Sequence, residues 1–151
     1  MRRDSRLSVA LHALLHMAEV GLLTSEQMAA QGDTNPVVIR RTMAGLRAAG
    51  IVRSEKGHGG GWSLVRRLED VTLYDVYEAL GEPTLLAIGN RTESPGCVVE
   101  KAVNRALEGA FHAAQALLVE QLRSITMASL ARDVATHGVG RHTKRKQVKH
   151  A

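Results

Sequence analysis

The stretch that decides the fold runs from residue 35 to residue 65 and reads NPVVIRRTMAGLRAAGIVRSEKGHGGGWSLV. Asn35 followed by Pro36 is typical of a helix start, because asparagine caps free N–H groups and proline needs no hydrogen bond at the first helical position. The helix is expected to run through Ala49 and to stop at Gly50. Two short strands, residues 51–55 and 62–65, are then expected around a tip with four glycines in six residues.

The segment before this stretch predicts two more helices. The first follows Asp4 and Ser5 and continues to about residue 19, with apolar residues at helical spacing, namely Leu7, Leu11, Leu14 and Ala18. Thr24-Ser-Glu-Gln27 has the form of a capping box, which predicts a short helix to about residue 30. Three helices and then a hairpin are the order of a winged helix-turn-helix. The fold class is therefore expected to be mainly α with a small β-hairpin.

The segment after the hairpin predicts another capped helix, a loop and a long helix. Residues 72–75 begin the capped helix, and Gly81 ends it. Residues 97–123 are helical in pattern throughout, and such a helix is about 40 Å long. Because it is apolar on more than one stripe, we expect it to pack against its twin in a homodimer. The expected contacts are Val103, Leu107, Phe111, Leu118 and Leu122.

These elements predict a domain organisation. We expect a DNA-binding winged head at residues 1–83, a linker at residues 84–96, a dimerisation helix with a short terminal helix at residues 97–136, and a disordered basic tail at residues 137–151. Thr126 is expected to cap the short terminal helix, which would run through Val134.

The charge distribution points to a polyanionic partner. Residues 1–67 hold ten Lys/Arg against five Asp/Glu, residues 68–140 hold five against ten, and residues 141–151 add five Lys/Arg and no acid. A basic head of this kind favours nucleic acid, although a generic basic surface gives the same count. No apolar window is long enough to span a membrane and no signal-peptide pattern opens the chain, so a cytoplasmic protein is expected.

The third helix carries the candidate DNA-reading residues. Arg40 and Arg47 lie on one face at helical spacing, and Arg41 lies a quarter-turn away. Arginine suits bidentate contacts with guanine and forks around phosphate, and a helix fits the major groove of duplex DNA. A solvated cationic face is the plainer interpretation of the helix alone. The hairpin tip favours DNA binding over a solvated face, because basic and glycine residues there permit close approach to a sugar–phosphate wall. The residues at the tip are Lys56, His58, Gly59 and Gly60.

Residues 46–64 resemble the signature of the Rrf2 family of bacterial transcriptional regulators. The signature runs from leucine-arginine through a glycine turn and a short strand to paired glycines and an aromatic residue. Residues 71–76 and 124–130 also fit, so the resemblance covers about residues 5–134. It implies a winged helix-turn-helix head with a long dimerisation helix, and homodimers that bind palindromic operators and usually repress. By the same resemblance Arg40 and Arg41 would read bases, Asn35 would meet phosphate, and Lys56 would stand at the position of the minor-groove wing residue.

The single cysteine, Cys97, decides the cofactor expectation. Several members of the family sense iron–sulfur clusters through three cysteines in the loop before the long helix. One thiolate per chain cannot hold such a cluster, so neither a cofactor nor a metal is expected. Cys97 remains a candidate redox or effector site, because a helix start stabilises thiolate. The plainer alternative is a small buried hydrophobe.

Two other functions compete with DNA binding. Residues 58–62 copy an esterase oxyanion-hole sequence, but the Gly-x-Ser-x-Gly elbow and the large α/β fold are missing, so no enzyme is expected. A protein-interaction module that has lost DNA binding is the more serious alternative, and the retained arginines weigh against it. His12 and His16 are four residues apart on the first helix, and an ordinary solvated pair is the expected interpretation.

Overall fold

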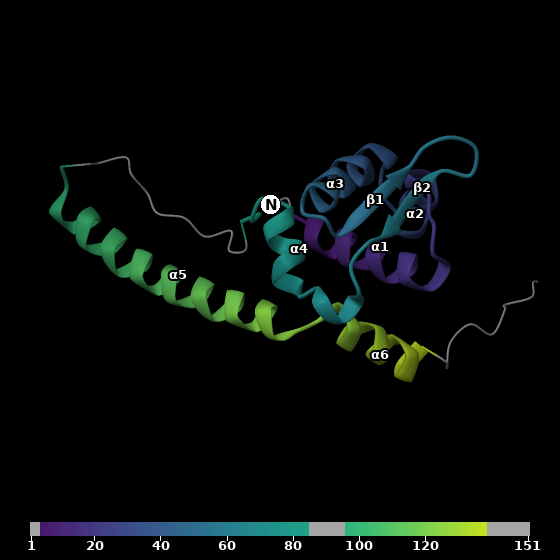
Figure 1. Ribbon diagram of the computed structural model, residues 1–151. Helices are drawn as coiled ribbons and strands as arrows, with labels where there is room; N and C mark the ends of the chain where they lie inside the picture. The colour runs from purple at the N-terminus through teal and green to yellow at the C-terminus, as the bar shows by residue number, and fades with distance from the viewer. Residues whose placement is uncertain (1–3, 85–95, 139–151) are drawn as a thin grey trace, which may run out of the picture.

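The computed structural model describes residues 4–84 and 96–138 (Figure 1). In chain order its elements are α1 (Arg6–Val20), α2 (Ser25–Gln31), α3 (Pro36–Ala48), β1 (Val52–Glu55), β2 (Gly61–Leu64), the 3-10 turn η1 (Leu68–Asp70), α4 (Leu73–Ala79), α5 (Val98–Ser124) and α6 (Met127–Gly138). This order confirms the mainly α winged helix-turn-helix with a long helix after it. None of the described helices is long and apolar enough to cross a bilayer.

The helix starts follow from local capping chemistry. Before α2, the Thr24 hydroxyl accepts from the Gln27 N–H at 3.1 Å, and the Gln27 side chain accepts from the Thr24 N–H at 2.9 Å. Before α3, Asn35 Oδ1 accepts from the Val37 N–H at 2.8 Å. At α1 the cap is Asp4, whose carboxylate accepts from the Arg6 N–H, whereas the Ser5 side chain makes no capping bond.

The core lies where α1, α3 and α4 meet. Leu14 of α1, Met43 of α3 and Val76 of α4 are all fully buried. The α3 and α4 backbones approach so closely that a Cβ on Gly45 would lie 2.6 Å from the Ala79 carbonyl oxygen. A side chain at residue 45 would therefore push the two helices apart.

The wing is a two-stranded antiparallel hairpin that is joined to the head by core packing and by backbone hydrogen bonds at Trp62. Val52 pairs with Leu64, and Glu55 pairs with Gly61, so the second strand begins one residue earlier than predicted. Trp62 also forms an isolated bridge with Leu23, with N–H to O distances of 2.8 and 3.1 Å. A Cβ on Gly61 would lie 2.7 Å from the Leu23 carbonyl oxygen, so only glycine allows this third backbone segment to come alongside.

Helix α5 leaves the head as a long arm, and only its C-terminal end joins the core (Figure 1). Val119 and Leu122 pack against the head, and the chain then turns into α6 through Thr126, which bridges Thr72. Leu122 is 9% exposed. Its side chain packs into the head of its own protomer, which leaves little of it for the predicted contact with a second copy, and that contact stays a prediction.

Two boundaries differ from the prediction at the C-terminal side. Helix α6 continues through Gly138 instead of ending at Val134, so residues 137 and 138 belong to this helix and not to the predicted tail. The Ser129 N–H donates to the Thr126 hydroxyl at 3.1 Å, which confirms the predicted cap. Most of the predicted linker at residues 84–96, and the tail beyond residue 138, lie outside the described residues.

Candidate nucleic-acid interface

Helix α3 has one core face and one exposed face. The core face holds Ile39, Met43 and Leu46, each at most 1% exposed, as the periodicity predicted. The opposite face carries Arg40 and Arg47, and Arg41 is exposed beside it. Figure 1 shows α2, α3 and the hairpin gathered on the side of the head away from α5 and α6. This side is the candidate interface.

Arg40 is held by an acid of the preceding helix. Its guanidinium lies 2.5 Å from the Glu26 carboxylate on α2, and both side chains are exposed. A hydrogen bond from the Glu26 backbone N–H, and then Arg40, hold the pKa of the Glu26 carboxyl below its usual value. The pair is therefore ionised at neutral pH, and Glu26 neutralises part of the positive charge of Arg40.

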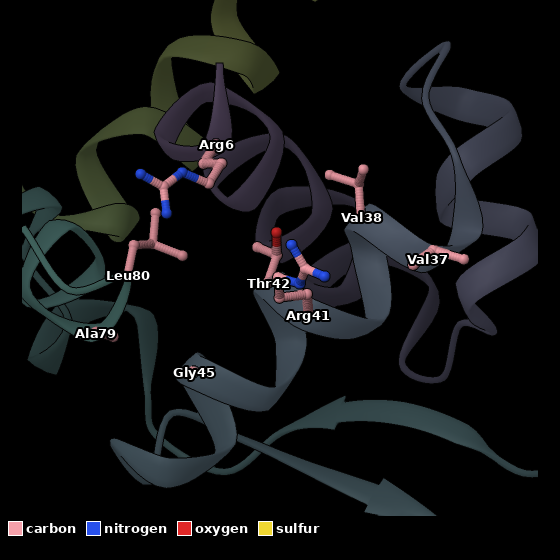
Figure 2. Close-up of a pocket in the computed structure, with 8 residues that line it drawn as sticks. All are labelled: Arg6, Val37, Val38, Arg41, Thr42, Gly45, Ala79 and Leu80. Atoms are coloured by element: carbon pink, nitrogen blue, oxygen red, sulfur yellow. The ribbon is translucent and has the colours of Figure 1, made fainter. Parts of the chain in front are cut away.

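Arg41 points into a hollow of about 320 Å³ between the starts of α1 and α3 and the end of α4. Figure 2 shows Arg41 rising from α3 beside Thr42, with Arg6 of α1 across the hollow. Arg6 is paired with Asp4 at 2.6 Å, whereas Arg41 makes no ion pair with any described residue. Its guanidinium is thus available for a ligand anion.

Arg47 connects the end of α3 to the wing. Its guanidinium donates to the Ser54 hydroxyl at 3.4 Å, and its central carbon lies 6.0 Å from the centre of the Trp62 ring. Both partners are neutral, so the positive charge of Arg47 remains uncompensated. The predicted nearness of Arg40 and Arg47 on the helix holds, but their side chains contact different elements.

The wing tip presents Lys56 and His58 to solvent, as predicted. Gly57 and Gly59 have φ values of +97° and +74°, which favour glycine. At Gly60 a Cβ would lie 2.3 Å from the Glu55 carbonyl oxygen, so the tip cannot close around a larger residue. The geometry of the turn itself therefore requires glycine at the tip, apart from any close approach to a sugar–phosphate wall.

The recognition helix and the wing share one surface hollow. Arg40 of α3 lines it together with Ser54, Glu55 and Gly60 of the hairpin. Glu55 does not stand alone, because Arg53 lies 3.2 Å from its carboxylate. The structure thus brings Arg40 and the wing glycine Gly60 together, while Asn35, at the start of the helix, is occupied as the α3 cap.

The ion pairs separate the basic residues of the head into two groups. Within residues 4–84, all Lys and Arg have a carboxylate within 4.0 Å except Arg41, Arg47 and Lys56. These three lie on α3 and at the wing. The uncompensated positive charge of the head is thus concentrated on the candidate interface, which is the pattern of a phosphate-binding surface.

Sequence reasoning missed the residues that position these cations. In the sequence Trp62 stands out only as an aromatic residue of the signature, yet its Nε1 donates to the Ser25 hydroxyl at 3.0 Å and fixes the wing against α2. Glu26 stands out in the sequence only as part of a capping box. Its pairing with Arg40 follows from the crossing of α2 and α3, which no local pattern encodes.

Cys97 stands at the N-cap of α5 with its side chain exposed. The alternative of a small buried hydrophobe is therefore wrong within the protomer. A redox or effector role for Cys97 stays a prediction.

Comparisons with known proteins agree with this geometry. The family model for Rrf2, described as an iron-dependent transcriptional regulator, matches residues 3–133. YwnA of Bacillus subtilis (strain 168), assigned as an HTH-type transcriptional regulator, is 33% identical over 134 residues, which are 89% of this chain and 97% of YwnA. A transcriptional regulator from Lactobacillus plantarum has a similar structure, with a TM-score of 0.73, 27% identity and coverage of 89% and 92%. CymR of B. subtilis, at 19% identity and a TM-score of 0.58 over 88% of this chain and 98% of its own, shows the same fold.

The iron in the family description can be tested against the residues of this chain. The sequence has one cysteine, whereas protein-bound iron–sulfur clusters use several thiolates. Within residues 4–84 and 96–138, no three His, Cys, Asp or Glu side chains lie close enough together to bind a metal. The residues of this chain therefore do not fit an iron–sulfur cluster.

Proposed function

This chain belongs to the Rrf2 family of transcriptional regulators, and from that premise we propose that it is a sequence-specific, cytoplasmic repressor. It would act as a homodimer on a palindromic operator. In this proposal α3 enters the major groove and the wing lies against the neighbouring backbone.

The observation that carries the proposal is the placement of uncompensated charge. Arg41, Arg47 and Lys56 are the basic residues of head segment 4–84 that lack a carboxylate partner. A protein that had lost DNA binding would have no need to keep them unpaired on α3 and the wing. The arrangement therefore favours a DNA-binding regulator over an interaction module.

The dimer part of the proposal rests on α5. Its exposed apolar side chains include Val99 at 71%, Val103 at 49% and Leu117 at 61%. A 27-residue helix with such a surface is best covered by a second copy of itself. Of the predicted contacts, Val103 and Leu107 are exposed and Phe111 and Leu118 are half-buried, so these four remain as proposed interface residues.

Sequencing of the genomic DNA retained by the purified protein tests the proposal. At moderate salt, fragments sharing one inverted repeat should be enriched, and the repeat should be protected from nuclease in both half-sites. Retention of DNA without a common sequence, or no retention at low salt, would contradict sequence-specific binding. Reporter expression from a promoter carrying the repeat then separates repression from activation.

A further inference from the structure

The outer face of α1 carries two histidines whose rings touch. The Nε2 atoms of His12 and His16 lie 2.8 Å apart. Their ring centroids are 4.7 Å apart, with an angle of 26° between the ring planes. The pair is thus already assembled, and its two nitrogen tips meet at one point on the helix surface.

The surroundings of the pair form a small hollow on the side of α1 that faces α6. The hollow is about 380 Å³ in volume and is lined by both histidines, Ser8, Leu15 and Glu19 of α1, and Val134 of α6. Neither imidazole makes an ion pair with a described residue. The two Nε2 atoms share a hydrogen bond, so a metal ion would replace that bond, with the proton of the donor ring moving to its Nδ1.

We propose that His12 and His16 chelate one divalent late first-row transition-metal ion, such as Ni²⁺ or Cu²⁺. Imidazole nitrogens bind such ions at about 2.0–2.1 Å, so two nitrogens at a right angle are about 2.9 Å apart, against about 3.4 Å in a tetrahedron. In the structure the two nitrogens are 2.8 Å apart in a hydrogen bond, so a small movement of the rings reaches either chelating distance. Ni²⁺ and Cu²⁺ are named because they stand high in the affinity order of divalent ions for nitrogen ligands.

The site is a two-residue chelate. No third His, Cys, Asp or Glu of the described residues lies close enough to complete a cluster, so water fills the other positions. Glu19 lines the same hollow and adds a negative charge that favours a cation. The bound ion would link two successive turns of α1 and so stabilise the folded head. This inference is independent of the proposed DNA binding.

Other histidines of the chain provide matched controls. His58 lies at the wing tip and His112 is exposed on α5, and among the described residues neither contacts another imidazole. His142 and His150 belong to the C-terminal segment and would bind metal unspecifically. The measurements therefore use the full-length, untagged chain with His142 and His150 replaced by alanine. This double variant is called the parent in the metal experiments.

The experiment is titration of the parent with NiCl₂, followed by calorimetry and by thermal unfolding. We expect one Ni²⁺ per chain and a melting temperature that rises with Ni²⁺ concentration. His12→Ala and His16→Ala should each raise the Kd at least about tenfold and abolish the rise in melting temperature. His58→Ala and His112→Ala should leave both quantities unchanged. Far-UV circular dichroism without metal shows whether each variant keeps its helices.

Two results with Ni²⁺ would overturn the proposal. One is a parent that binds no Ni²⁺ up to millimolar concentration, which would leave the two rings as a hydrogen-bonded pair only. The other is an affinity that falls equally in the His58 or His112 variant. With Cu²⁺ as a second probe, an electron paramagnetic resonance spectrum without nitrogen coupling, or with the same coupling after His16→Ala, would also contradict it.

Discussion

The indole nitrogen of Trp62 donates a 3.0 Å hydrogen bond to the hydroxyl of Ser25, and this bond joins the wing to the helix before the recognition helix. Ser25 is 6% exposed, so its hydroxyl has little access to water if the indole is removed. The wing therefore does not hang freely from α3. Its strands and the helix-turn-helix form one unit, and the orientation of the wing depends on this contact.

Replacement of Trp62 by phenylalanine should destabilise the protein by about 1–3 kcal/mol, because it leaves a buried hydroxyl without its donor. Urea unfolding of Trp62→Phe, Ser25→Ala and the double variant measures this effect. We expect a coupling energy of about 0.5–1.5 kcal/mol between the two sites. Strictly additive single effects would show that the bond between the two side chains contributes nothing to stability.

Replacement of Arg41 and replacement of Lys56 should weaken DNA binding in different ways. Arg41→Ala is expected to cost about 1–3 kcal/mol on the operator and to relax the preference for one base pair. Lys56→Ala should weaken all DNA sequences together and lower the slope of log K against log salt by about one. Fluorescence anisotropy at several salt concentrations measures both. Arg53→Ala is the control, because Arg53 is paired with Glu55.

Removal of the acid beside Arg40 should strengthen DNA binding. Glu26→Gln releases the guanidinium and takes a negative charge away from the approaching phosphates, so operator affinity should rise about two- to fivefold at low salt. The pKa of Glu26 lies below its usual value, so the Glu26–Arg40 pair of the unmodified protein stays ionised at these pH values. The gain in affinity should therefore not change between pH 6 and pH 8. Glu19→Gln on α1 serves as the control. An affinity that drops would mean that Glu26 positions Arg40 for its base.

Two substitutions on α5 should separate dimerisation from folding. Val103→Asp places a charge on an exposed residue far from the head, so it should give folded monomers with an unchanged melting curve for the head. Leu122→Ala instead leaves a cavity in the core and should cost about 2–5 kcal/mol of stability. Sedimentation velocity and urea unfolding distinguish the two. A dimer that survives Val103→Asp together with Leu107→Asp would place the interface elsewhere.

The sequence was sufficient wherever the deciding chemistry is local. The caps at Thr24, Asn35 and Thr72 and the glycine-rich tip are set by residues within a few positions of each other, and the structure has all of them. The same holds for the buried and exposed faces of α3. These features required only helical periodicity and capping preferences.

What the sequence did not reveal depends on contacts between distant segments. Leu122 has the same periodicity as the exposed apolar residues of α5, and only the packing of the C-terminal end of α5 against the head distinguishes it. The contact between Gly45 and Ala79 likewise arises from the crossing of two helices. The apolar periodicity of a helix does not show which of its turns pack against the head and which remain exposed.

Because α5 is long, a small rotation at one end of the helix becomes a large displacement at its other end. The helix has 27 residues, and among the described residues its contacts with the head core lie at the end near Thr126. A rotation of about 5° at that end would move the far end of a 40 Å rod by about 3.5 Å, which is about the rise of one base pair along DNA. In the proposed dimer, a small change where α5 packs against the head would therefore be large enough to move the two heads out of register with their half-sites.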